Sequence, residues 1–316
     1  MCLALILVLL LGWGLEGSLV ALVASEVVIG GYLLIGTKIH SFIKPRCFST
    51  ELLKELLKYS WPMVPNCMSM WAMRMSNRLV ITAIMGVAAN AVFAAAFKIP
   101  QLITIAQTTF TMAWQENASL SVTDGDKEAY YTHTQALVFD FLAGSAALLI
   151  AITPVLYALL IQGDYSEGLC QVPILVLGNL FYGMSAYIGG IYVAYLKTKS
   201  VGLTTFFAAI INLVIDIVFI PFVGLYAASI AYVVSYLFLW IYRMVDVQKF
   251  QSLGLNVPRY VIVVAILACM VFIGQFDGIV PQLINGAIGV VVFFVLCRKV
   301  ITGSFKMIVR RVKHAK

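Results

Sequence analysis

The sequence predicts an all-α integral membrane protein, a polytopic helical bundle with nine full spans and one partial span. Of the 316 residues, 62% are hydrophobic and only 11% are charged, whereas soluble proteins have about 45–50% and about 25%. The apolar residues gather in runs near the ~20 residues that cross a bilayer as a helix. Too little polar surface remains for a soluble enzyme, a nucleic-acid-binding domain or a disordered chain. Continuous apolar runs also lack the alternation of barrel strands.

The predicted spans follow one another along the whole chain. They lie near residues 15–36, 60–85, 88–112, 133–161, 169–195, 200–221, 225–242, 260–275 and 279–297. A tenth run, from Cys2 to Trp13, would reach only ~18 Å as a helix, less than the ~30 Å of a bilayer core. It has neither the basic start nor the cleavage pattern of a signal peptide. We therefore expect it to be the tail of a helix that begins earlier, in an N-terminally truncated chain.

The connecting segments divide by charge into two alternating sets. One set, which includes the C-terminal tail 298–316, carries 18 of the 21 lysines and arginines. The segments of the other set, near 13–17, 86–89, 162–168, 222–224 and 276–278, carry none. Because basic segments stay on the cytoplasmic side of a membrane, we expect the first set and the C-terminus to face the cytoplasm. Segment 37–59 contains an amphipathic stretch, TELLKELLKY, that is expected to lie along the membrane surface.

Ionisable residues inside the predicted spans indicate a hydrated path through the bundle. Each costs about 2.5–3.5 kcal/mol at the bilayer centre, so such residues face cavities or partners. They are Glu26, Arg74, Arg78, Lys98, Asp140 and Asp216.

Three of these residues are cations, and they form the first candidate site. Arg74 and Arg78 share one helix face by their spacing, and Lys98 falls at a similar depth on the next helix. A compact cation cluster suits a pyrophosphate group. Alternatively, Arg78 extends to the outer surface, Lys98 pairs with an acid, or the span boundaries lie elsewhere. Polar residues near these cations would form the substrate path: Asn66, Asn77, Gln101, Thr104, Thr108 and Tyr182.

The acids inside the spans are candidates for ion coupling. Asp216 shares a helix face with Asn212, and Glu26 falls near the middle of its span. Such acids, Asp140 included, carry protons or sodium in transporters, or they neutralise the cations named above. Span 169–195 has Tyr182 among small polar residues at helical spacing, which fits either a sugar path or close helix packing.

No pattern of enzyme or metal chemistry stands out in the sequence. The six cysteines are scattered without a CxxC pair, and the three histidines fall in connecting segments. We therefore expect no disulfide framework, no metal site and no cofactor. No nucleophile and base are spaced for covalent catalysis, so an enzyme is not expected.

Two stretches carry a resemblance to a known family. The first contains LLKYSWPMVPN, SNRLVITAIMG, VFAAAFKIPQLI and FTMAWQENA within residues 56–118. The second is IINLVIDIVFIPFVGLYAASIAYVVSY, residues 210–236. Both resemble bacterial polysaccharide and O-antigen flippases of the MOP superfamily, which includes the lipid II flippase and the MATE exporters. Asn77 stands where that family usually has an acid, and Asp216 where an asparagine is common.

The resemblance implies a fold, an organisation and a function. Family members have two lobes and up to fourteen spans, of which this chain would hold the last ten. Residues 1–36 would be a remnant of the N-terminal lobe, 37–59 a linker, 60–242 a C-terminal six-helix lobe, 260–297 a final helix pair and 298–316 a basic tail. The final pair would hold a lipid tail.

The implied activity is the flipping of undecaprenyl-pyrophosphate-linked oligosaccharide across the bacterial inner membrane, for O-antigen, capsule or exopolysaccharide synthesis. The implied partners are that substrate, membrane lipids and the polysaccharide polymerase machinery. The alternatives are a MATE-like exporter of small molecules, which would favour acids over arginines in its cavity, and an inactive truncated fragment. A polymerase or ligase would need sizeable outer loops, which the predicted topology lacks.

Overall fold

The computed structural model describes residues 6–7, 12–38, 48–61, 63–123, 125–161, 163, 165–276 and 278–314. Over these residues the regular structure is helical, and no strand occurs among them. The chain divides into two compact units, Met1–Leu57 and Lys58–Lys316. The division falls inside the amphipathic helix α4, Thr50–Ser60.

The first unit contains helix α2, Gly14–Gly36, which covers the first predicted span. Its apolar side chains are almost all exposed, with only 6% of the spanning window buried. Glu26 is exposed on this helix. Most of the predicted partial span, Cys2 to Trp13, lies outside the described residues.

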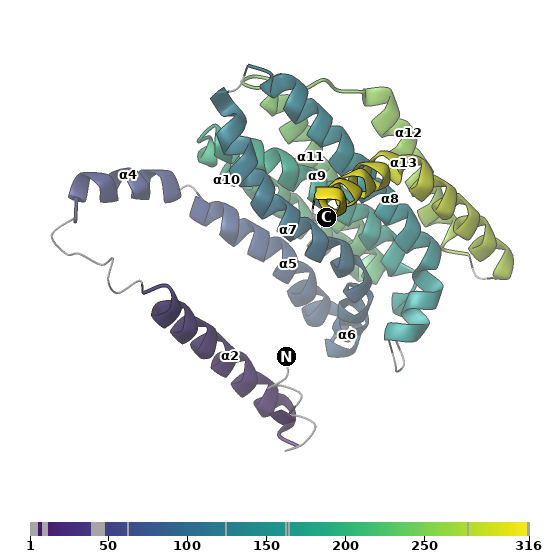
Figure 1. Cartoon of the computed structure of the whole chain (residues 1–316). Coiled ribbons are helices and arrows are strands. Elements are labelled where there is room, and N and C mark those ends of the chain that lie inside the picture. The colour runs from purple at the N-terminus through teal and green to yellow at the C-terminus, as the bar shows by residue number, and fades with distance from the viewer. Residues whose placement is uncertain are drawn as a thin grey trace. The chain divides into compact units, whose positions relative to one another are not determined.

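The second unit is a helical bundle. Its helices are α5 (Met63–Met85), α6 (Val87–Ala96), α7 (Lys98–Leu120), α8 (Lys127–Leu160), α9 (Gln171–Ala194), α10 (Thr198–Val223), α11 (Leu225–Val247), α12 (Val257–Ile273) and α13 (Ile279–His314). Helix α9 is the central element: 89% of its spanning window is buried, and it packs against α7, α8 and α11 (Figure 1). Helix α10 packs against α5 and α11, and α13 packs against α8.

Every predicted span coincides with a helix or a pair of helices, but the count of nine spans is not confirmed. Six helices are long and apolar enough to cross a membrane, or seven if the bent pair α6–α7 is one span. Helix α12 has only 17 residues, and polar side chains interrupt the apolar surface of α5.

The predicted span 88–112 is broken into two successive helices, with a bend of 49° between their axes. The break has a local cause in Pro100. Proline has no N–H to donate, and its ring clashes with the carbonyl four residues earlier, here that of Ala96. Helix α6 accordingly ends at Ala96, and Lys98 opens the next helix. Lys98 therefore lies at a helix junction, not within a continuous span.

Helices α5 and α10 run parallel. Thr205 donates a hydrogen bond to Asn66 near their beginnings, and Ser76 donates one to Asn212 further along both. Near their ends, a Cβ atom at Gly224 would lie 3.3 Å from the side chain of Met85. Both helices therefore start at the same end of the bundle. The predicted topology requires this, because each of the two spans follows a basic segment expected on the cytoplasmic side. Gly224 has φ +64°, a left-handed conformation that glycine adopts without strain, and it turns the chain directly from α10 into α11.

Candidate functional site

Five helices of the second unit enclose a cavity of about 310 Å³, here named the Arg243 cavity. Helices α5, α7, α9, α10 and α11 all contribute to its wall. Its polar lining includes Asn66, Thr108, Tyr182, Ser185, Thr205 and Arg243. Three of these, Asn66, Thr108 and Tyr182, belong to the substrate path predicted from the sequence.

Arg243 is the most unusual side chain of this cavity, because it is a buried cation with only 4% of its surface exposed. Its Nε donates a hydrogen bond to the hydroxyl of Thr204 at 3.2 Å. Its Nη1 donates to the carbonyl of Ser185 at 2.9 Å. Its Nη2 donates to the carbonyl of Val201 at 3.2 Å and to the hydroxyl of Thr205 at 2.9 Å. Four of the five guanidinium N–H groups are thus bound, and the side chain is fixed in one orientation.

All four acceptors of Arg243 are neutral. Neither the Lys249–Asp246 pair nor the Arg259–Asp140 pair involves Arg243, and no carboxylate among the described residues pairs with it. A guanidinium stays protonated under all ordinary conditions, and a buried charge without a counter-ion is costly. The cavity wall thus carries a fixed positive charge that an anionic ligand would neutralise.

A second hollow, here named the Arg78 cavity, has a volume of about 300 Å³. Arg78, Asn77 and Gln101 provide its polar lining, and Phe93 and Phe97 provide apolar walls. Arg78 is half-buried. Within the described part of the chain, its guanidinium has no hydrogen bond or ion pair, so it is free to meet a ligand.

Two tyrosines of α11 lie between the cavities. Tyr232 lines the Arg78 cavity and Tyr236 lines the Arg243 cavity, with ring centroids 4.8 Å apart. The Tyr232 hydroxyl donates to Asn179 Oδ1 at 2.7 Å, and Asn179 Nδ2 donates to the Thr104 hydroxyl at 3.0 Å. Thr104, a predicted path residue, therefore takes part in a polar link that joins α7, α9 and α11.

The structure does not place Arg78 and Lys98, two of the three predicted pyrophosphate ligands, in one cavity. Arg78 lines a cavity, whereas Lys98 is exposed and lines neither of the two cavities described above. The side chain of Arg74 lies outside the described part of the structure. Arg243 follows the predicted span 225–242 and was therefore expected in a cytoplasmic connecting segment, but it is part of α11, because that helix continues to Val247.

Helical spacing was the signal that would have revealed Arg243. It continues the face formed by Tyr232, Tyr236 and Leu239, at intervals of four, three and four residues. All four side chains are buried. Extending the predicted span by one turn would therefore have placed the guanidinium in the interior.

The predicted ion-coupling residues have different surroundings. Asp216 and Asn212 are completely buried on α10, where both Asp216 carboxyl oxygens and the Asn212 amide nitrogen lack hydrogen-bond partners among the described residues. Asp140 is also buried, but it accepts a hydrogen bond from Arg259 in an ion pair. Asp140 is thus neutralised by an arginine at the start of α12.

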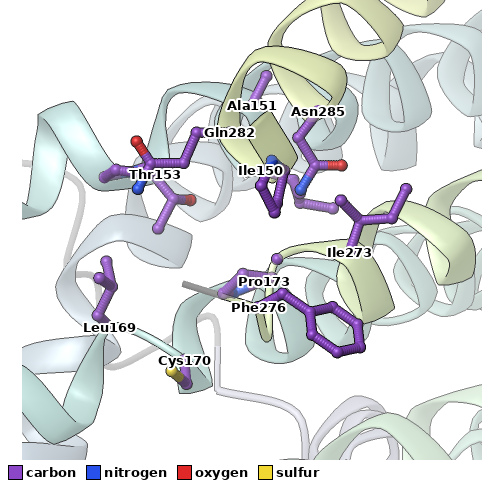
Figure 2. Close-up of a pocket in the computed structure, with 13 residues that line it drawn as sticks. Ile150, Ala151, Thr153, Leu169, Cys170, Pro173, Ile273, Phe276, Gln282 and Asn285 are labelled. Atoms are coloured by element: carbon purple, nitrogen blue, oxygen red, sulfur yellow. The ribbon is translucent and has the colours of Figure 1, made fainter. Parts of the chain in front are cut away.

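Two further hollows lie beside α12 and α13. A groove of about 690 Å³ is lined only by apolar or weakly polar side chains, among them Ile262, Ile266 and Val291. A pocket of about 30 Å³ lies among α8, α9, α12 and α13, with the polar side chains of Thr153, Gln282 and Asn285 at its edge (Figure 2). This volume holds about one water molecule and is too small for a sugar.

The chain is similar to known proteins in two ways. Residues 1–156 match the family described as polysaccharide biosynthesis protein. The fold is similar to the solved structure of the lipid II flippase MurJ in an inward closed conformation, with a TM-score of 0.61 and 17% sequence identity. That similarity covers 94% of this chain and 65% of the flippase. No curated protein is significantly similar to this chain.

The two comparisons cover different parts of the chain. The family match covers the part of the chain that carries the first group of resembling motifs, and the shared fold covers nearly all of it. This chain spans slightly less than two thirds of the flippase. Both findings agree with the resemblance found in the sequence, although the family match covers slightly less than half of the chain. The shared fold and the six apolar helices indicate a multi-pass membrane protein.

Proposed function

We propose that this protein flips a lipid-linked oligosaccharide, carried on undecaprenyl pyrophosphate, across the bacterial inner membrane during O-antigen, capsule or exopolysaccharide synthesis. The observation that carries the proposal is the Arg243 cavity. It combines a buried guanidinium without an acidic partner and hydroxyl groups in one hollow. This hollow lies inside a helical membrane bundle whose fold is that of a lipid flippase.

Each part of such a substrate has a chemical counterpart in the bundle. A pyrophosphate needs cationic N–H donors, which Arg243 and Arg78 offer. A sugar suits hydroxyl groups and aromatic faces, which Thr108, Tyr182 and Tyr236 offer. A polyprenyl tail suits the apolar groove between α12 and α13. The proposal therefore assigns headgroup and tail to different parts of the second unit.

The proposed pyrophosphate ligands are still Arg74, Arg78 and Lys98, but the structure does not support the three assignments equally. Arg78 has the strongest, because it faces a cavity that also contains Asn77 and Gln101. Lys98 lies at the bend between α6 and α7, where a change of the bend angle would carry it toward or away from the path.

Asp216 is the best supported of the proposed coupling residues. A buried carboxylate without partners is costly as an ion, so the uncharged acid suits this site, and proton exchange would follow any opening of the α5–α10 contact. Asn212 lies one turn away on the same face. The ion pair of Asp140 with Arg259 supports a positioning role for that acid, and Glu26 belongs to the first unit.

The proposed orientation has the basic segments and the C-terminus in the cytoplasm. The Arg243 end of α11 then faces the side on which lipid-linked oligosaccharides are assembled. Polymerase machinery would take up the flipped substrate on the opposite side.

Deletion of the gene in its host tests the proposed function. We expect complete lipid-linked repeat units to accumulate in the inner leaflet and surface polysaccharide to be lost, with both defects repaired by the intact gene. Single unpolymerised units on the outer face would indicate a polymerase instead. An unchanged lipid-linked pool together with altered sensitivity to small toxic compounds would indicate an exporter.

A further inference from the structure

The two cationic residues that line cavities lie at different depths in the bundle. Helices α5 and α10 run parallel and end together, where Gly224 lies beside Met85. Helix α11 starts at that same end and returns. Arg78 lies seven residues from the end of α5, or ~10 Å. Arg243 lies 18 residues from the start of α11, or ~27 Å. The two arginines are therefore separated by ~16 Å along the bundle.

On the same scale Tyr232 lies level with Arg78, and Tyr236 lies ~6 Å further toward Arg243. Tyr232 and Tyr236 pack against each other, and the Tyr236 ring also contacts Tyr182 of α9 with centroids 5.2 Å apart. Their hydroxyl-bearing rings form a polar aromatic layer between the two cavities. The Arg243 guanidinium binds Thr205, which binds Asn66, and Asn66 precedes Arg78 on α5 by 12 residues, or ~18 Å. Even with the Arg78 side chain extended toward it, a pyrophosphate group is too short to contact both guanidinium groups at once.

We propose that the transport path contains two separate anion sites, and that Arg243 binds a phosphate or pyrophosphate group at a site distinct from that of Arg78. This proposal deepens the proposed function and rests on it for the order in which the sites are used. The lipid-linked headgroup occupies Arg243 first, passes the tyrosine layer, and then meets Arg78.

The geometry around Arg243 favours a ligand site over a purely structural clamp. The four neutral acceptors hold the guanidinium in place but leave its charge unbalanced. The second N–H of Nη1 has no acceptor among the described residues. Nη1 also lies beside Gly189 of the cavity wall, where a Cβ atom would approach it to 3.1 Å. The missing side chain at Gly189 keeps this N–H accessible to the cavity.

The hydroxyl network extends the site from Arg243 to α5. Thr205 accepts a hydrogen bond from Nη2 and donates one to Asn66 Oδ1 at 2.6 Å. Chains of this kind polarise one another and hold their members in place. An anion at Nη1 would therefore bind a preorganised donor, which lowers the entropic cost of binding.

Titration of the detergent-solubilised full chain with inorganic pyrophosphate tests the two-site proposal. Isothermal titration calorimetry gives the number of sites, and the shift in melting temperature gives an independent readout. We expect two sites in the unaltered protein, one in Arg243→Gln, one in Arg78→Gln, and none in the double variant. If the unaltered protein has only one site and either single substitution abolishes it, the proposal is wrong. The proposal is also wrong if Arg243→Gln still binds pyrophosphate at two sites.

Three further variants separate ligand binding from folding. Arg243→Lys keeps the charge but not the planar fork, and we expect roughly 10-fold weaker binding in a chain that still shows a cooperative melting transition without ligand, at a lower temperature. Gly189→Ala keeps the arginine and crowds Nη1, and it should weaken only the Arg243 site. Lys249→Gln removes an exposed cation near the same end of α11, whose side chain is 72% exposed, and it should leave both sites intact. Equal losses in Lys249→Gln and Arg243→Gln would show a nonspecific charge effect and overturn the assignment.

A second ligand identifies the source of the phosphate group. Farnesyl pyrophosphate carries the same anion on a short isoprenoid tail. Tighter binding of this ligand than of inorganic pyrophosphate, with the same dependence on Arg243, would indicate a lipid-borne headgroup. Equal affinities would indicate that the site takes free pyrophosphate and would remove the lipid from the proposal. If the titration shows both anion sites while deletion of the gene leaves the lipid-linked pool unchanged, the proposed function is refuted but the two sites are not.

Discussion

Tyr232 and Tyr236 lie one turn apart on α11 with their ring centroids 4.8 Å from each other, yet each lines a different cavity. The pair forms the boundary between the part of the path that contains Arg78 and the part that contains Arg243. This arrangement makes the aromatic layer a functional element as well as a packing element, and it leads to distinct expectations for the ring and for the hydroxyl group.

Replacing Tyr236 by alanine removes the ring from this boundary. We expect the Arg243 and Arg78 cavities to merge, and the free energy of unfolding to fall by about 3–5 kcal/mol, as for other buried aromatic truncations. The melting temperature measures the loss. Tyr236→Phe keeps the ring and is the matched control. A large loss in Tyr236→Phe would show that the hydroxyl, not the ring, stabilises the boundary.

Gly178 allows Tyr232 to pack closely against α9. A Cβ atom at position 178 would lie 2.4 Å from the Tyr232 ring, so Gly178→Ala must displace that ring. We expect a loss of about 1–3 kcal/mol in stability, together with weaker pyrophosphate binding at the Arg78 cavity. Gly286→Ala serves as the control, because a Cβ atom there meets no other atom within 4 Å. Equal melting temperatures for the two variants would contradict the packing role of Gly178.

The carboxyl group of Asp216 is expected to be uncharged in this conformation. Asp216→Asn therefore replaces it with a neutral group of the same shape, and we expect less than about 1 kcal/mol of change in stability. Transport driven by an imposed proton gradient should nevertheless be lost, because the amide does not bind or release a proton near neutral pH. Retention of gradient-driven transport in this variant would exclude Asp216 as the coupling residue.

The ion pair of Asp140 with Arg259 connects α8 to the beginning of α12. Arg259→Gln leaves a buried carboxylate without its partner, and we expect a loss of about 1–3 kcal/mol. Adding Asp140→Asn removes the uncompensated charge and should recover much of that loss. A double-mutant cycle from melting data measures the coupling. Strictly additive losses would mean that the pair does not stabilise the position of α12.

The sequence predicted the helices well because hydrophobic runs of this length have only one stable form in a membrane, where every backbone polar group must be bonded internally. The apolar run that forms α10 is an example. The break at Phe97 was harder, because Pro100 by itself does not say whether a helix bends or stops. This break accounts for one of the three predicted spans that are not single spanning helices, and the other two are α12, which is short, and α5, which carries polar side chains.

The candidate site was predicted only in part. Asn66, Thr108 and Tyr182 were expected on the path and do line the Arg243 cavity. Arg243 was missed because charge alone assigned it to a connecting segment, although its helical spacing with Tyr236 placed it in the interior. The partner of Asp140 was missed because ion pairs between distant helices depend on how α8 and α12 pack, and no spacing along the chain records that.

The most direct test of the central claim is a translocation measurement on the purified 316-residue chain in liposomes. A fluorescent undecaprenyl-pyrophosphate oligosaccharide is placed in both leaflets, and the externally accessible fraction is followed with a membrane-impermeant quencher. We expect the unaltered chain to let the quencher reach substrate from the inner leaflet, and we expect Arg243→Gln, but not Lys249→Gln, to slow this at least 10-fold. If the unaltered chain is folded and binds pyrophosphate but leaves the inner-leaflet substrate protected, the protein is not a flippase of this substrate.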